Sequence, residues 1–241
     1  MKLFRVIAVT ILVIVIGLFS YAITQFSPAD QEGTKTEVVI NEGERSALIA
    51  EKLETQKLIK NGFVFYSYLK LTRAKILPGT YEIDPSRSAT EIAYQIATGK
   101  FKVAKVTIIE GWRATQMEKY FIEDKKLKNL TGFAQLAASQ EGYLFPDTYE
   151  VRVDIKSEEM IKLLTDTFND KTKALNVTPE TVILASIVER ESKADSDRQP
   201  VAGVYANRIK AGMLLQADPT VQYAKGNWAT ITVEYYKNVI S

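Results

Sequence analysis

The first strongly patterned stretch of the chain is a run of apolar residues close to its start. Residues 6–23 carry no charge and are mostly aliphatic, and Lys2 and Arg5 precede them. Eighteen residues in a helix rise about 27 Å, close to the thickness of the bilayer hydrocarbon. The pattern therefore predicts a transmembrane helix, and we expect an anchor over residues 6–26.

The charges beside this run predict its orientation. Two basic residues precede it, and the acidic Asp30 and Glu32 follow it. This asymmetry places residues 1–5 in the cytoplasm and the bulk of the chain on the outer side of the plasma (inner) membrane. A cleaved signal peptide is the alternative, with Ser-Tyr-Ala at 20–22 as a cleavage site. A retained single-pass anchor is favoured because the run is longer than a usual signal core.

After a polar linker at residues 27–36, the pattern changes to short strand-like and helix-like segments. The segment VVINEGERSALIAEKL from Val38 is similar to VTIIEGWRATQMEKYF from Val106, at an offset of 68 residues. Each copy predicts a strand, a Glu-Gly turn and a helix. Chance similarity between two common βα units is the alternative. Between the copies, residues 79–83 predict a strand, and Ser-Ala-Thr-Glu at 88–91 predicts a capping box.

The strand-like and helix-like segments together predict an α+β fold with three regions after the linker. The first copy and the helix after it resemble the small βααβ LysM module, a fold often used to hold N-acetylglucosamine polymers. The resemblance implies a LysM-like module over 37–101, with a structural spacer as the alternative. A second βα unit and an ordered loop, EGYLFPDTY, occupy 102–154. Apolar periodicity then predicts a mostly helical domain over 155–241.

The composition limits the chemistry that this chain can perform. With 31 basic and 29 acidic residues, no overall field favours nucleic acid. The chain contains no Cys and no His, which excludes thiolate nucleophiles, disulfides, Cys/His zinc sites and Ser-His-Asp relays. Any catalysis must therefore use carboxylates, hydroxyls, Lys, Tyr or Arg.

One carboxylate in the second half has the sequence context of a general acid. Thr-Pro-Glu at 178–180 predicts the start of a helix, with Thr as the N-cap and Pro at the first helical position. At about 100° per residue, Glu189 lies away from the apolar stripe of this helix. The stripe contains Leu184, Ile187, Val188 and Glu191.

Partial burial would raise the pKa of Glu191, as a proton donor near neutral pH requires. The alternative is a structural ion pair with Arg208, Arg198 or Lys193. On spacing alone, the ion pair is favoured over the catalytic role.

A family resemblance changes this balance. The segments ASIVERES (185–192), VAGVYANR (201–208) and GMLLQADPTV (212–221) look like the signature of the endolytic murein transglycosylases of the MltG (YceG-like) family. The EGYLFPDTY loop at 141–149 is similar to another of its motifs. With the predicted anchor and the LysM-like module, the resemblance covers nearly the whole chain.

In that family the Glu before Ser or Thr in the Glu-x-Glu-Ser/Thr motif is catalytic, and it matches Glu191. The resemblance also implies substrate-binding roles for a group that follows in the chain, for which loop packing is the alternative. This group is Gln216, Asp218, Thr220 and Tyr223.

The activity implied by the resemblance is that of a peptidoglycan lytic transglycosylase, a carbon-oxygen lyase. Such an enzyme cleaves the MurNAc-GlcNAc bond without water and leaves a 1,6-anhydro end. One carboxylate suffices because the substrate's own 6-hydroxyl is the nucleophile, whereas ordinary glycosidases need two carboxyl groups. The implied partners are glycan strands, the membrane and cell-wall synthases, and no metal or other cofactor is required.

Three alternatives remain at this point. A hydrolytic muramidase would use Asp218, Asp147 or Glu141 as a second carboxylate. A non-catalytic, membrane-tethered peptidoglycan-binding scaffold would need none. A Ser-Lys acyl enzyme built on Ser67 and Lys70 is disfavoured because no Lys-Thr-Gly motif accompanies the pair.

The end of the chain adds one expectation. The sequence stops before the Pro-Tyr-Asn-Thr-Tyr and Gly-Leu-Pro-Pro-Gly segments that usually follow in this family. The catalytic domain over 155–241 is therefore expected to be incomplete.

Overall fold

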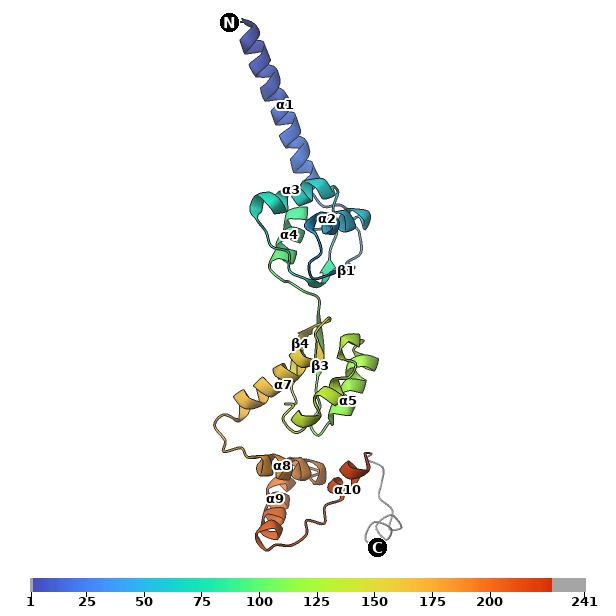
Figure 1. Cartoon of the computed structure of the whole chain (residues 1–241), viewed down its shortest axis with the longest axis vertical. Helices are drawn as coiled ribbons and strands as arrows, with labels where there is room; N and C mark the ends of the chain where they lie inside the picture. The colour runs from blue at the N-terminus through green and yellow to red at the C-terminus, as the bar shows by residue number, and fades with distance from the viewer. Residues whose placement is uncertain (1, 227–241) are drawn as a thin grey trace. The chain divides into compact units, whose positions relative to one another are not determined.

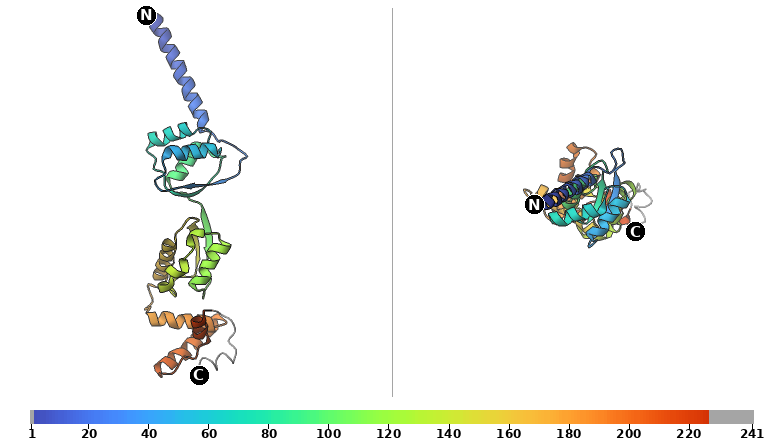
Figure 2. Two further views of the ribbon diagram at one scale, coloured as in Figure 1. Left: turned by 45° about the vertical axis from the view of Figure 1, so that its right-hand side comes forward. Right: turned by 90° about the horizontal axis from the view of Figure 1, so that it is seen from above.

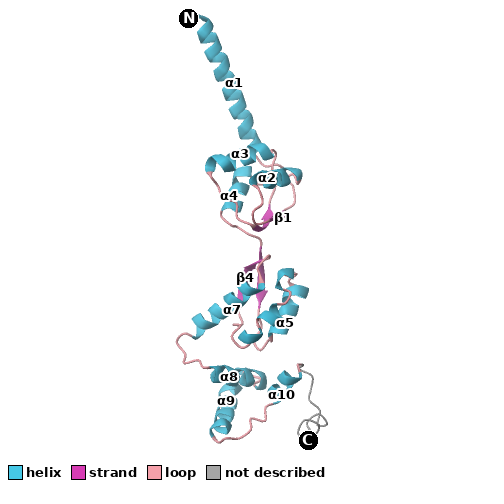
Figure 3. Cartoon of the chain, viewed as in Figure 1, coloured by secondary structure: helices cyan, strands magenta, loops and turns pink. Residues whose placement is uncertain are grey.

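The computed structural model describes residues 2–226 and divides the chain into two compact units. The first unit comprises residues 1–104 and 151–154, and the second comprises residues 105–150 and 155–241. Helices and two short strand pairs give an α+β fold (Figures 1 and 3). The last part of the helical domain predicted over 155–241 lies outside the described residues.

The N-terminal apolar run forms one continuous helix, α1 (Lys2–Phe26), seen in both views of Figure 2. Its last residue packs on α3 (Gly62–Thr72), where the rings of Phe26 and Tyr68 meet edge to face with centroids 5.4 Å apart. A helix must be both long and apolar enough to span the hydrocarbon of a bilayer, and none among the described residues is. The predicted anchor over 6–26, and the single-pass localisation with a cytoplasmic N-terminus that depended on it, are therefore wrong.

The first unit is built on an antiparallel strand pair. Strand β1 (Thr36–Ile40) pairs with β2 (Gly79–Ile83), and the register runs from Thr36↔Ile83 to Ile40↔Gly79. Two helices, α2 (Ser46–Thr55) and α3, connect the strands, and α4 (Ala89–Ala97) follows them. Alternate residues of β1, Val38 and Ile40, are buried, as expected for a strand with one face on the core. The strand predicted at 79–83 is confirmed.

The capping box predicted at the start of α4 is also present. The backbone N–H of Glu91 donates to the Ser88 hydroxyl, and the Glu91 carboxylate accepts from the Ser88 N–H in return. The Ser88 hydroxyl also donates to the Glu91 carboxylate, and this hydrogen bond, followed by that from the Ser88 N–H, holds the pKa of Glu91 below its usual value. The capping box shows that the Ser-Ala-Thr-Glu sequence at 88–91 determines where this helix begins.

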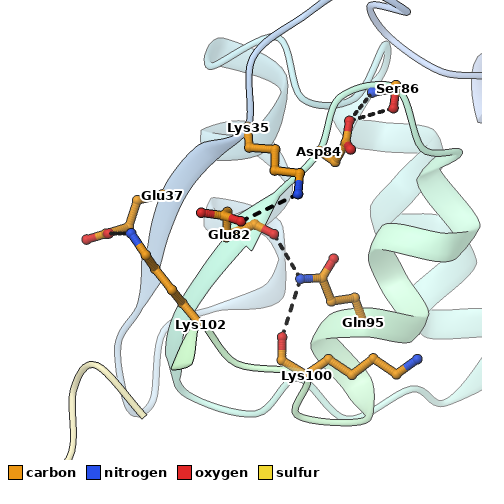
Figure 4. A network of polar contacts seen from close by, with 8 residues as sticks. All are labelled: Lys35, Glu37, Glu82, Asp84, Ser86, Gln95, Lys100 and Lys102. Atoms are coloured by element: carbon orange, nitrogen blue, oxygen red, sulfur yellow. Dashed lines mark hydrogen bonds and ion pairs between the residues drawn. The ribbon is translucent and has the colours of Figure 1, made fainter. Parts of the chain in front are cut away.

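A polar network ties α4 to the strand pair (Figure 4). The buried Gln95 amide donates to the carbonyl oxygens of Glu82, at 3.0 Å, and Lys100, at 3.3 Å. Beside it, Lys102 forms an ion pair with Glu37 at 2.7 Å, and this hydrogen bond raises the pKa of Lys102. The Gln95 amide is satisfied within the fold, as a buried polar group must be.

Tyr81 lies at the centre of the first core. Its side chain is fully buried, and its hydroxyl donates to the carbonyl oxygens of Leu77, at 2.7 Å, and Ile96, at 3.2 Å. Its ring packs on Phe101 with centroids 5.1 Å apart. Burial raises the pKa of Tyr81 to about 12. The phenol therefore remains a hydrogen-bond donor throughout the physiological pH range.

Asp154, the last residue of the first unit, also forms polar contacts within that unit. Its carboxylate accepts from the Thr80 N–H at 2.9 Å and pairs with Arg152 at 2.8 Å. Burial opposes the charged form, but the Arg152 guanidinium and the Thr80 N–H hold the pKa of Asp154 below 3.8. A lowered pKa stabilises the fold above the unfolded-state value, and this stabilisation is lost as the pH falls through the folded-state pKa.

We expect Asp154→Asn to lower the free energy of unfolding by about 1 kcal/mol at pH 7, since the pair is partly solvated. The difference from wild type should shrink as the pH is lowered below about 4, where the wild-type carboxylate also becomes neutral. Urea denaturation at several pH values measures it. A deficit that stays constant down to pH 2 would contradict the role given to the charge.

The second unit contains residues 105–107 and 148–150 of a short strand pair, and a series of helices. Strand β3 (Val103–Thr107) pairs with β4 (Thr148–Arg152). Phe121 and Phe133, from the chain segment that connects the strands, are fully buried, with their rings perpendicular and their centroids 5.2 Å apart. The remaining elements are α5 (Ala114–Lys119), the π-helical turn η1 (Tyr120–Asp124), the 3-10 turns η2 (Lys128–Leu130) and η3 (Ala138–Gln140), α6 (Phe133–Leu136), α7 (Ser157–Thr172), α8 (Pro179–Glu191), α9 (Asp195–Lys210) and α10 (Asp218–Lys225).

The helical character predicted after Asp154 is confirmed over the described residues. Met160 and Leu164 of α7 are fully buried, as the apolar periodicity indicated. The two copies of the internal repeat also share their turn: Gly43 and Gly111 both adopt a φ of 74°, a left-handed conformation that Gly reaches without strain.

Candidate active site around Glu191

Helix α8 presents the candidate acid. The Thr178 hydroxyl accepts from the Thr181 N–H at 3.3 Å and Pro179 is the first helical residue, so the predicted start is confirmed. The stripe is also as predicted, because Ile187 and Val188 are buried. Glu191 is the last residue of the helix and is half-buried. The helix therefore brings this carboxylate to the edge of an apolar cluster.

A cavity of about 200 Å³ lies beside the Glu191 side chain. Burial raises the pKa of Tyr205, and the neighbouring Glu191 carboxylate raises it further. A phenol that remains protonated therefore faces the carboxylate. The cavity is lined by Glu191, Val201, Val204, Tyr205, Arg208 and Gln216.

Two of the three cations proposed as ion-pair partners of Glu191, Arg198 and Arg208, contact other groups. Arg198 pairs with Glu189 at 3.1 Å and with Asp195 at 3.3 Å. The guanidinium of Arg208 donates to the carbonyl oxygen of Leu215 and lies 3.5 Å from the Gln216 amide oxygen. Within residues 2–226, Glu191 forms no ion pair. The ion pair of Glu191 that spacing alone favoured is thus absent from this part of the chain.

The four residues expected to bind substrate occupy different positions. Gln216 lines the cavity. Asp218 opens α10, and its charge contributes to raising the pKa of the cavity residue Tyr205. The Thr220 hydroxyl donates to the Ala217 carbonyl oxygen at 2.7 Å, within its own turn. The Tyr223 hydroxyl donates to Glu141 at 2.6 Å. Only Gln216 of the four is therefore part of the cavity wall.

Helix α9 contributes cavity residues that the sequence had not singled out, apart from Arg208, which was considered as an ion-pair partner of Glu191. Val201, Val204, Tyr205 and Arg208 line the cavity at spacings of three and four residues, which places them on one face of a helix. This periodicity was visible in the sequence. What it did not show was that this face lies against Glu191, because that depends on how α8 and α9 pack.

Two of the three carboxylates considered as a second catalytic acid, Glu141 and Asp147, are held by other contacts. Glu141 accepts hydrogen bonds from the Ala114 N–H and the Tyr223 hydroxyl. Asp147 accepts from the Thr148 N–H at 2.7 Å and lies 3.7 Å from Lys171. Neither Glu141, Asp147 nor Asp218 lines the cavity described above.

The Ser67 and Lys70 pair lacks the geometry of a nucleophile and its base. The Ser67 hydroxyl donates to the Phe63 carbonyl oxygen at 2.8 Å, within α3. The Lys70 ammonium lies over the Tyr66 ring, 5.6 Å from its centroid. The acyl-enzyme alternative therefore gains no support.

Two loops approach α8 at glycine residues, and at Gly142 the approach leaves little room for a Cβ. A Cβ at Gly111 would lie 3.5 Å from Arg190, and one at Gly142 would lie 3.0 Å from Val182. Both glycines have positive φ, at 74° and 92°. The second repeat and the EGYLFPDTY loop thus pack against the helix that ends at Glu191.

We expect Gly142→Ala to lower the free energy of unfolding by about 2 kcal/mol, through backbone strain and crowding against Val182. Gly132→Ala is the matched control, because Gly132 has a φ of 86° and a Cβ there would meet nothing within 4 Å. Strain alone should cost the control about 1 kcal/mol. Urea denaturation measures both, and equal losses would contradict the crowding.

A half-buried carboxylate beside a cavity, in a chain without His or Cys, is typical of enzymes that work by carboxylate acid-base chemistry. Comparison with known proteins identifies the family within this broad class of enzymes. The chain belongs to the YceG-like family, whose model matches residues 38–239.

Relatives with an assigned name are similar to most of this chain. The chain is 27% identical over 249 residues to an endolytic murein transglycosylase of Bacillus subtilis (strain 168), covering 87% of this chain and 69% of that protein. It is also 27% identical over 257 residues to an endolytic murein transglycosylase of Streptococcus pneumoniae serotype 2, covering 86% and 46% of the two chains. It thus spans about half the length of the pneumococcal relative.

A solved structure is also similar to this chain. The crystal structure of a yceG-like protein from Listeria monocytogenes is 26% identical, with a TM-score of 0.43. The match covers 83% of this chain and 78% of that chain.

Proposed function

We propose that this protein is an endolytic peptidoglycan lytic transglycosylase that cleaves MurNAc-GlcNAc bonds and leaves 1,6-anhydro-MurNAc ends. The observation that supports it most is Glu191, a half-buried carboxylate beside a cavity that forms no ion pair within residues 2–226. It stands in the Glu-x-Glu-Ser pattern of the family to which the chain belongs. The names of the Bacillus and Streptococcus relatives give the same activity.

Glu191 acts twice in the proposed reaction. As an acid, it gives its proton to the glycosidic oxygen while the bond from that oxygen to the muramic anomeric carbon breaks. As the resulting carboxylate, it takes the proton of the muramic 6-hydroxyl while this oxygen bonds to the same carbon. The proton is thus returned to Glu191, and no water is consumed. The Tyr205 hydroxyl, which interacts with the carboxylate, orients it for both steps.

The other cavity residues bind the glycan. The Gln216 amide offers both a donor and an acceptor to sugar hydroxyl groups, and its contact with Arg208 restrains it. Asp218 and Thr220 shape the first turn of α10 next to it. Aliphatic carbons of Val201 and Val204 provide an apolar surface for the sugar ring.

The first unit provides a second binding site for the glycan strand. The proposal that this unit is LysM-like is supported by its β1-α2-α3-β2 order, since such a module has the order βααβ. A hollow of about 220 Å³ lined by Ser46, Leu69, Lys70, Arg73 and Ala74 offers polar groups and an aliphatic surface to N-acetylglucosamine. Cell-wall synthases, which supply new glycan strands, are the proposed protein partners, on the family resemblance alone.

The test is digestion of purified peptidoglycan by the complete protein, followed by mass analysis of the soluble fragments. We expect internal cuts whose new muramic ends are lighter by one water than reducing ends. Reducing ends would identify a hydrolytic muramidase and overturn the lyase mechanism. Strands that keep their length would overturn the enzymatic function and favour a glycan-binding scaffold.

A further inference from the structure

Three segments of the second unit meet at the Glu141 carboxylate. Its Oε1 accepts from the Ala114 N–H at 2.9 Å, and its Oε2 accepts from the Tyr223 hydroxyl at 2.6 Å. Ala114 opens α5, Glu141 belongs to the EGYLFPDTY loop, and Tyr223 lies on α10. One carboxylate therefore connects the second copy of the repeat, the loop and the last described helix.

Arg113 reinforces this contact by charge and by stacking. Its guanidinium lies over the Tyr223 ring, 4.3 Å from the centroid, and its Nε is 3.7 Å from Glu141 Oε1. That separation is too long for a hydrogen bond, and Nε has no hydrogen-bond partner among the described residues. The Arg113 and Glu141 side chains are only 19% and 22% exposed, so water screens their attraction less than at an open surface.

The contact makes the hydroxyl of Tyr223 a hydrogen-bond donor to Glu141. The hydrogen bond to Glu141 raises the pKa of Tyr223, and burial raises it further, so the phenol remains a donor at neutral pH. Its single O–H is used by Glu141 and is not offered to a sugar. The substrate-binding role expected for Tyr223 stays a prediction, and the contact with Glu141 gives this residue a structural role as well.

Tyr223 is connected to the cavity through its own helix. Helix α10 begins at Asp218, directly after Ala217, which is 2% exposed. Ala217 packs in the same cluster as Ile187 and Val188 of α8 and Tyr205 of α9. Gln216, which lines the cavity, precedes Ala217 in the chain. Holding α10 by Tyr223 thus holds Gln216 beside Glu191.

We propose that Glu141 and Arg113 are positioning residues of this site, which act through Tyr223 to hold α10 and Gln216 at the cavity. The inference rests on the proposed function. It assigns Glu141 a role different from that of a second catalytic acid, because both of its oxygens accept hydrogen bonds from the protein itself.

Substitution of Glu141 by Gln separates the two roles. The Gln carbonyl oxygen can accept from the Ala114 N–H while its amide nitrogen donates to the Tyr223 oxygen, so both contacts survive without the charge. We expect Glu141→Gln to retain kcat within about threefold of wild type, since only the attraction to Arg113 is lost. A catalytic carboxylate replaced in the same way would lose at least about 100-fold.

Removal of the contact should have a larger effect than this conservative change. We expect Glu141→Ala and Tyr223→Phe each to lower kcat about tenfold, mainly in kcat rather than in KM, because the cavity wall shifts relative to Glu191. The double variant should be no worse than Glu141→Ala, since both changes remove the same hydrogen bond. Glu118→Ala is the control, because Glu118 accepts from the N–H groups of Gly132 and Ala134, neither of which lines the cavity.

The decisive experiment measures kcat and KM of these variants on purified glycan strands, together with amide hydrogen exchange of residues 218–225. Support consists of rescue by Gln, a non-additive double variant, and faster exchange of α10 in Glu141→Ala but not in Glu118→Ala. A Glu141→Gln loss above about 100-fold, additive effects, or unchanged exchange each overturn the proposal. If wild type does not cleave glycan, the proposed function fails instead. The exchange measurement still tests the contact, because it needs no activity.

Discussion

Glu191→Gln is expected to lower kcat for glycan cleavage by about 1000-fold, the largest effect of any single substitution in this chain. The amide has nearly the shape of the carboxyl group but can neither give a proton to the glycosidic oxygen nor take one from the 6-hydroxyl. Because Glu191 serves in both steps, no other group among the cavity residues replaces it. Fragment release from purified peptidoglycan measures the effect.

Glu189→Gln is the matched control for this experiment. Glu189 lies on the same helix and forms an ion pair with Arg198, so its loss should change kcat by less than about twofold. A second readout is the titration of Tyr205, whose pKa the Glu191 charge helps to raise. In Glu191→Gln this pKa should fall. Retention of more than a tenth of the wild-type rate would exclude Glu191 as the acid.

Tyr81→Ala is expected to have the largest effect on stability, lowering the free energy of unfolding by about 4 kcal/mol. Tyr81 is fully buried, so the change leaves a cavity at the centre of the first unit. It also removes a hydroxyl that donates to the carbonyl oxygens of Leu77 and Ile96. Urea denaturation followed by circular dichroism measures the loss.

Two further variants divide this effect into its parts. Tyr81→Phe retains the ring and removes only the hydroxyl, so we expect a loss of about 1–2 kcal/mol. Tyr94→Ala removes a tyrosine that is 60% exposed on α4 and should cost about 0.5 kcal/mol. Similar losses for Tyr81→Ala and Tyr94→Ala would show that the first core does not depend on Tyr81.

Local features of the fold were predictable because short-range chemistry determines them. The Thr178 cap with Pro179 set the start of α8, and the Ser88 capping box set the start of α4. The apolar stripe placed Glu191 on the side of Ile187 and Val188. Each of these inferences required only the neighbours along one helix.

The errors and omissions arose where the outcome depends on more than one segment. The count of apolar residues in 6–23 predicted a membrane span that the structure contradicts, and the same helix instead ends in contact with Tyr68. The contacts of Tyr205 with Glu191 and of Tyr223 with Glu141 join separate elements. No periodicity within one element encodes such pairings, so sequence patterns could not supply them.

The hydrogen bond between Glu141 and Tyr223 joins residues 82 positions apart, which has a consequence for folding order. Closing so long a loop is entropically costly, so contacts within helices and between neighbouring segments form earlier. On the ribosome, the cavity beside Glu191 therefore becomes complete only after α10 has emerged and docked. A nascent chain that ends before α10 already contains Glu191, but the cavity that would bind a sugar is incomplete.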